Sequence, residues 1–112
     1  MAKTSTINGH LLYRGISSGI KNLLEYQDKL DEINVFPIPD GDTGTNMCFT
    51  LMPILEECKN TVSERADHTL KVVSDCALDS ARGNSGTIIA QWFHGLSKAS
   101  EEKEMLDIKD IA

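Results

Sequence analysis

Apolar residues recur at helical spacing through most of this 112-residue chain, and this pattern limits the fold more than any other feature. Leu12, Ile16 and Ile20 stand four positions apart, which places them on one face of an amphipathic helix. The alternation of polar and apolar residues that is typical of strands is essentially missing. The sequence therefore predicts an all-α fold.

Helical periodicity predicts four helices before the end of the chain, over about 9–29, 45–58, 65–81 and 84–98. Pro53 lies inside the second of these, so we expect a kink or a restart of the helix there. Gly15 and Gly19 lie on the first, where they would let another backbone approach closely. Pro37 and Pro39 predict an extended connector between the first two helices.

The helix expected over 84–98 carries an apolar stripe that we assign to the core: Ile88, Ile89, Trp92, Phe93 and Leu96. The last residues, 106–112, have the pattern of a fifth helix with Asp107 as its N-cap. Barely one turn of that helix fits in the chain, and an isolated helix of this length is not stable. We therefore interpret residues 1–112 as the front portion of a longer chain.

The composition narrows the class of protein. Lys and Arg total 11 and Asp and Glu total 17, and the net charge of −6 argues against nucleic acids and anionic membranes as partners. No run approaches the ~20 apolar residues of a membrane helix, so no membrane span is expected. Cys48, Cys58 and Cys76 lie far apart, which suits a reducing compartment better than a disulfide framework. We expect a cytoplasmic protein.

The first segment with recognisable chemistry is Asp40-Gly41-Asp42-Thr43-Gly44-Thr45-Asn46, where the second helix begins. In an extended segment Asp40 and Asp42 project to the same side, and two neighbouring carboxylates need a cation or positive donors. Carboxylate oxygens bind Mg²⁺, and a helix N-terminus binds phosphate. The same residue types also favour ordinary turns and helix caps, so a plain turn is the alternative interpretation.

The second such segment, Ser80-Ala81-Arg82-Gly83-Asn84-Ser85-Gly86-Thr87, joins the last two of the four helices. Gly83 suits a helix C-terminal cap and Asn84 or Ser85 an N-cap, which would make the segment a tight turn. Alternatively, it supplies N–H and hydroxyl donors to a phosphate chain. Arg82 would then neutralise phosphate charge, or else pair with an acidic residue. Two glycine-rich helix starts in one short chain favour the phosphate-binding interpretation.

Residues 34–47 followed by 81–86 closely resemble the nucleotide-binding domain of the dihydroxyacetone kinase L-subunit superfamily. Within it, the sequence is most similar to the N-terminal domain of the bacterial fatty-acid kinase ATP-binding subunit, from about Ile7 to Gln91. The resemblance implies a DhaL-type barrel of antiparallel helices, of which residues 1–112 would contain the first four to five. It also implies ATP and Mg²⁺ as cofactors.

By this resemblance Asp40 and Asp42 would be magnesium ligands. The residue nearest to a third ligand, an aspartate in dihydroxyacetone kinases, is Asn34, which stands one position further from the motif. The phosphates would be lined by residues of both segments: Thr43, Gly44, Thr45, Asn46, Gly83, Asn84, Ser85 and Gly86. The fatty-acid kinase pattern more often has glycine where this chain has Ser80.

The implied reaction is transfer of the ATP γ-phosphate, in which alignment and charge neutralisation do most of the catalysis. In fatty-acid kinases the acceptor is a fatty-acid carboxylate presented by a separate lipid-binding protein. In dihydroxyacetone kinases the acceptor is a ketose hydroxyl. Two other classes stay open: a non-catalytic interaction fragment that completes its fold with a partner or as a homodimer, and a structural helical domain whose glycine-rich turns are only turns.

Overall fold

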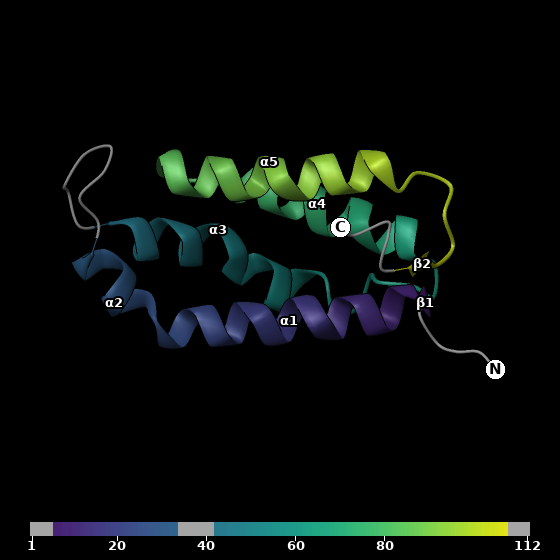
Figure 1. Ribbon diagram of the computed structural model, residues 1–112, viewed down its shortest axis with the longest axis horizontal. Helices are drawn as coiled ribbons and strands as arrows, with labels where there is room; N and C mark the ends of the chain where they lie inside the picture. Colours follow the sequence, from purple (N-terminus) through teal and green to yellow (C-terminus); the bar gives the residue numbers. More distant parts are fainter. Residues whose placement is uncertain (1–5, 34–41, 108–112) are drawn as a thin grey trace.

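The computed structural model describes residues 6–33 and 42–107 and shows an elongated helical bundle (Figure 1). In chain order the elements are β1 (Thr6–Ile7), α1 (Gly9–Glu25), α2 (Gln27–Glu32), α3 (Thr43–Glu57), α4 (Ala66–Ser80), α5 (Gly83–Ala99) and β2 (Leu106–Asp107). The predicted all-α class is confirmed, because the strands have two residues each and pair only with each other in the described ranges. The predicted proline-rich connector lies outside the described residues.

The four long helices lie side by side along the length of the bundle (Figure 1). Long helices that follow one another in the sequence run antiparallel, so α3 and α5 run in the same direction and begin at the same end. The short α2 lies at that end, packed against α3. The main core lies between the four long helices and is formed by apolar side chains that are withdrawn from water, among them Ile20, Ile54, Val73, Ala90 and Phe93.

The first two predicted helices differ in detail from those observed. The helix expected over 9–29 is divided at Tyr26, whose N–H donates to the Leu23 carbonyl over 3.0 Å, and α2 continues in a new direction. The α3 helix passes through Pro53 without the expected restart. Leu51 and Ile54, on either side of this proline, are buried, and their packing offsets the missing N–H donor.

The strands β1 and β2 close the opposite end of the bundle, where Leu106 pairs with Ile7 and is completely buried. The prediction of a helix is therefore wrong for Leu106 and Asp107, because a distant segment pairs with their backbone. Residues 108–112 lie outside the described residues. The segment before β2 is attached to the start of α4, where the Ala66 N–H donates to the Glu104 carbonyl over 2.8 Å.

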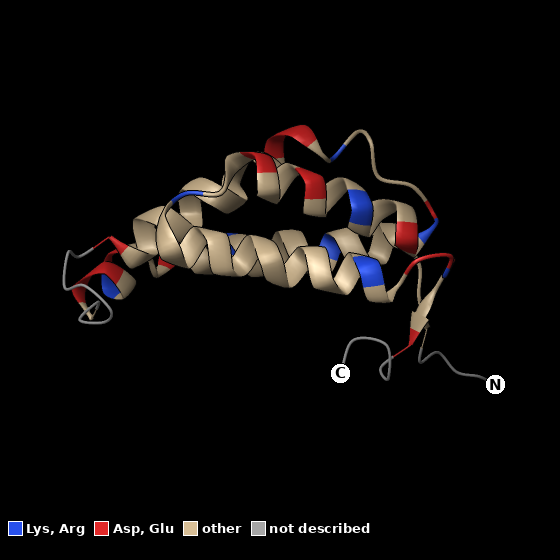
Figure 2. Cartoon of the chain, turned by 90° about the horizontal axis from the view of Figure 1, so that it is seen from above, with Lys and Arg blue, Asp and Glu red and all other residues tan. Residues whose placement is uncertain are grey.

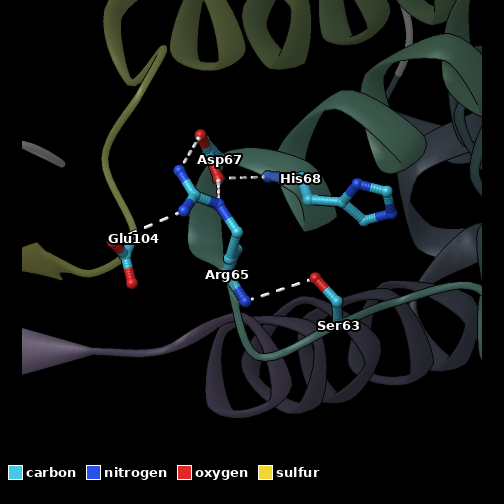
Figure 3. A network of polar contacts seen from close by, with 5 residues as sticks. All are labelled: Ser63, Arg65, Asp67, His68 and Glu104. Atoms are coloured by element: carbon cyan, nitrogen blue, oxygen red, sulfur yellow. Dashed lines mark hydrogen bonds and ion pairs between the residues drawn. The ribbon is translucent and has the colours of Figure 1, made fainter.

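Arg65 reinforces this attachment (Figure 3). Its guanidinium donates to both carboxylate oxygens of Asp67, over 3.1 and 3.0 Å, and pairs with Glu104 at 3.4 Å. The Arg65 N–H donates to the Ser63 hydroxyl over 3.2 Å. The network lies where α4 begins and α5 ends, far from the starts of α3 and α5. We therefore assign it a role in the stability of the fold.

Two residues that the sequence assigned to the core are exposed. Ile88 is 70% exposed and Trp92 is 56% exposed, whereas Phe93 is buried as expected. Trp92 lines an apolar groove of about 420 Å³ between α1, α3 and α5. Gly15 and Gly19 also face open space, so the close backbone approach expected there is not made within the described residues. These departures share a cause, because α1 packs on α3 and α4 rather than on α5.

No helix in the described ranges combines the length and the apolar character that crossing a bilayer requires.

Candidate functional site

The starts of α3 and α5 meet at one end of the bundle (Figure 1). The Ser85 hydroxyl, in the first turn of α5, donates to the Thr43 carbonyl, in the first turn of α3, over 3.2 Å. The two glycine-rich segments are thus brought together. Of the three predicted metal ligands the structure places Asp42, at the N-cap of α3. Asn34 and Asp40 lie outside the described residues.

Gly44 allows the first turn of α3 to approach α2 closely. A Cβ at this position would lie 2.3 Å from the Gln27 carbonyl oxygen and 2.9 Å from the Leu30 Cβ, so a side chain has no room here. The Gln27 side-chain amide also donates to the Thr45 hydroxyl over 3.3 Å. The start of α3 therefore rests directly on α2.

Asp31, on α2, caps α3 from outside that helix. Its Oδ1 accepts the Thr45 N–H at 2.9 Å, and its Oδ2 accepts the Thr45 hydroxyl at 2.6 Å. Thr45 is the third residue of α3, and its N–H is one of those that a helix leaves without an internal partner. The hydrogen bonds from the Thr45 hydroxyl and N–H hold the pKa of the Asp31 carboxyl below its ordinary value. A negative charge is thus fixed where the helix dipole favours it.

Asn46 and Gly83 join the two segments more deeply. Asn46 is 7% exposed, and its side-chain amide packs against Gly83, the first residue of α5. Gly83 has a φ of 70°, a left-handed conformation that favours glycine. The glycine therefore supplies both the backbone conformation and the space that this contact needs.

Thr50, one turn further along α3, holds the connection between α4 and α5. Its hydroxyl donates to the Asn46 carbonyl over 2.8 Å and accepts the Arg82 N–H at 3.1 Å. The Ser80 hydroxyl lies 2.8 Å from the carbonyl oxygens of both Thr50 and Cys76, which share it as a donor. Gly86 packs so closely that an added Cβ would lie 2.2 Å from the Thr50 hydroxyl oxygen. Ser80, which departs from the fatty-acid kinase pattern, thus has a structural role in this chain.

Arg82 precedes α5, and its guanidinium lies over the Phe49 ring, 4.5 Å from the ring centroid. No ion pair of Arg82 with an acidic residue is found within the described ranges. Stacking uses the face of the guanidinium, whereas its N–H donors lie in the plane of the group. An anion can therefore bind Arg82 without breaking the contact with Phe49.

The two adjacent helix starts differ in charge. The α3 start has Asp42 at its N-cap and the Asp31 carboxylate beside it, whereas the first turn of α5 contains no acidic residue. Figure 2 shows the acidic positions of α2 and of the start of α3 gathered at this end. Chemically, the carboxylates at the α3 start suit a hard cation, and the N–H groups at the α5 start suit an anion.

Sequence reasoning singled out neither Asp31 nor Thr50. Thr50 carries a weak signal, because it is an isolated polar residue in the otherwise apolar run 47–55 of the second predicted helix. Asp31 carries none, since it stands 14 residues before Thr45 and belongs to a different helix. Its role follows from tertiary structure alone.

The chain belongs to the DAK2 domain family, whose family model matches residues 37–112. The DAK2 domain is the DhaL-type domain of the dihydroxyacetone kinase family, which is associated with kinase activity and with nucleotide binding. The matched part contains both glycine-rich segments and the helices that carry them.

Three staphylococcal proteins are similar to nearly the whole chain. Uncharacterized proteins of Staphylococcus saprophyticus, Staphylococcus epidermidis and Staphylococcus aureus are each 42% identical to it over 108 residues. The alignments cover 96% of this chain and 20% of each relative. The chain therefore spans about a fifth of the length of these curated relatives.

Proposed function

We propose that residues 1–112 form the N-terminal part of a DhaL-type kinase domain, and that the adjoining starts of α3 and α5 bind the triphosphate of Mg–ATP. The observation that carries this proposal is the hydrogen bond from Ser85 to Thr43, because it puts two helix N-termini and both glycine-rich segments in one place. Membership of the DAK2 family supports a nucleotide as the ligand.

In this proposal the phosphates lie along the first turns of both helices, at Thr43, Gly44, Thr45, Asn46, Gly83, Asn84, Ser85 and Gly86. Asp40 and Asp42, with Asn34, would hold Mg²⁺, which would screen the negative charge of the phosphates. The chemistry of Asp42 fits, because Mg²⁺ prefers oxygen ligands. Within residues 6–33 and 42–107 no group of three or more His, Cys, Asp or Glu is arranged to hold a metal, so the proposed site depends on Asp40 as well.

The proposed reaction transfers the γ-phosphoryl group of ATP to a fatty-acid carboxylate that a lipid-binding partner protein presents. A carboxylate oxygen bonds to the γ-phosphorus while the bond from that phosphorus to ADP breaks, which yields an acyl phosphate and ADP. The N–H groups at the start of α5 and the Arg82 guanidinium stabilise the charge on the transferred group. A ketose hydroxyl is the alternative acceptor, and ADP release with each acceptor in turn distinguishes the two.

Calorimetric titration of a non-hydrolysable ATP analogue, with and without Mg²⁺, tests the proposal. We expect magnesium-dependent binding that Asp40→Ala abolishes and Asp42→Asn weakens by about tenfold or more. Asp75→Asn is the matched control, because it makes the same change of charge at an exposed position of α4. A folded chain that binds no nucleotide, or an Asp40→Ala variant that binds as well as the wild type, would contradict the proposal.

A non-catalytic interaction fragment is the second candidate, and the exposed apolar groove between α1, α3 and α5 favours it. In that case we expect a homodimer that forms at high concentration, without turnover, and that Trp92→Ser weakens. His94→Ser is the control, since His94 is also exposed on α5 but does not line the groove. Sedimentation velocity over a wide concentration range measures this association, and a monomer throughout would exclude it.

A further inference from the structure

The first turn of α3 is held from two sides. On the α2 side, Asp31 binds Thr45 through both carboxylate oxygens, and Gly44 brings the two backbones into contact. On the α5 side, the Ser85 hydroxyl binds the Thr43 carbonyl. The turn that begins immediately after Asp42 is therefore fixed between two neighbouring helices.

The contact between Asp31 and Thr45 is the stronger of these attachments. The 2.6 Å distance from the Thr45 hydroxyl oxygen to Asp31 Oδ2 is typical of a short, charge-assisted hydrogen bond. The second oxygen of Asp31 accepts the Thr45 N–H, so the carboxylate is directed at α3. Asp31 would therefore affect a bound ligand by fixing the position of α3.

We propose that Asp31 is a positioning residue for the metal-dependent part of nucleotide binding, because through Thr45 it fixes the helical turn that follows Asp42. This inference rests on the proposed function. It also changes the role proposed for Thr45, whose N–H and hydroxyl bind Asp31 rather than a phosphate. The donors closest to the phosphates then come from the start of α5. A turn that is ordered before the ligand arrives loses less conformational freedom when the ligand binds.

A double-mutant cycle tests the inference, with the non-hydrolysable ATP analogue titrated at a series of Mg²⁺ concentrations. Asp31→Asn and Thr45→Val are each expected to raise the Mg²⁺ concentration for half-maximal binding by about tenfold. The double variant is expected to be no worse than the weaker-binding single variant, because both substitutions disrupt the charge-assisted hydrogen bond between the Thr45 hydroxyl and the Asp31 carboxylate. At saturating Mg²⁺ the Asp31→Asn variant should approach the wild-type affinity.

Two controls accompany the cycle. Thr45→Ser keeps the hydroxyl that binds Asp31, so it should need much less Mg²⁺ for half-maximal binding than Thr45→Val. Asp28→Asn removes a charge from an exposed position of α2 and should have no effect. If Asp31→Asn melts below the assay temperature, Thr45→Val carries the same test, because it removes only the hydroxyl end of the contact.

The possible results separate this inference from the function on which it rests. A wild-type chain that binds no nucleotide overturns both. A wild type that binds, with an Asp31→Asn variant that binds equally well or more tightly at every Mg²⁺ concentration, overturns only the positioning role. Additive losses in the double variant also overturn it, because the hydrogen bond between Asp31 and the Thr45 hydroxyl would then not be the shared cause of the two losses.

Discussion

Gly83 and Asn46 lie so close that a Cβ added to Gly83 would be 2.3 Å from the Asn46 side-chain nitrogen. The two residues belong to different helices, and their contact sets how α5 meets α3. The hydrogen bond from Ser85 to Thr43 depends on the same alignment, because Ser85 is only two residues beyond Gly83. The geometry of the candidate site therefore depends on a backbone position that only glycine satisfies well.

Gly83→Ala is expected to destabilise the fold by about 2 kcal/mol or more, because it adds left-handed backbone strain to a steric clash with Asn46. Gly95→Ala is the matched control on the same helix, since a Cβ at Gly95 meets nothing within 4 Å. It should leave the stability unchanged or raise it by up to about 1 kcal/mol. Urea denaturation measures both, and equal effects of the two substitutions would contradict the role given to Gly83.

Thr50→Val is expected to lower the free energy of unfolding by about 2 kcal/mol, because it removes a buried hydroxyl and leaves the Arg82 N–H without its acceptor. The valine has nearly the same shape, so the loss reports hydrogen bonding rather than packing. Thr61→Val removes the hydroxyl of an exposed threonine and should cost less. A Thr50→Val variant as stable as the wild type would show that the hydroxyl does not hold the α4–α5 connection.

The three thiols are expected to be unreactive in the folded chain. Burial, followed by the proximity of Cys58, raises the pKa of the Cys76 thiol to about 12, and burial is also the main cause of the raised pKa values of Cys48 and Cys58. Because the thiolate is the reactive form, iodoacetamide at about pH 8 should modify the native chain slowly and all three cysteines rapidly in denaturant. Mass spectrometry locates the modified residues. Native labelling of Cys76 at the denatured rate would contradict its raised pKa.

The sequence was sufficient to predict the long helices, because their apolar spacing is local information. It also identified the two glycine-rich segments that meet at the starts of α3 and α5. It was not sufficient for contacts between distant segments. Leu106 forms a strand because Ile7 lies beside it, and no pattern within residues 106–112 reveals that partner.

The exposed face of α5 shows a different limit of the sequence. The apolar stripe of α5 does exist, but burial depends on which helix packs against it, and spacing cannot specify the packing partner. Trp92 is consequently exposed while Phe93, the next residue, is buried. At the candidate site the same limit hides Asp31, whose importance arises from its contact with Thr45.

The network around Arg65 predicts how stability changes with acid. The hydrogen bonds from Arg65, assisted by the His68 N–H, hold the pKa of the Asp67 carboxyl below its ordinary value. The folded chain therefore binds a proton at Asp67 less readily than the unfolded chain. The stabilisation is complete above the ordinary pKa and is lost as the pH falls through the lower folded value.

Asp67→Asn removes this contribution, so its free energy of unfolding should decline less than that of the wild type between about pH 6 and about pH 3. The difference should be modest, because the Arg65 side chain is 47% exposed and its ion pairs are screened by water. Asp75→Asn is the control, since the Asp75 pair with Lys71 is exposed on both sides. Urea denaturation across this pH range measures the effect. Identical pH dependence in the wild type and Asp67→Asn would show that the Arg65 contact does not favour the folded carboxylate.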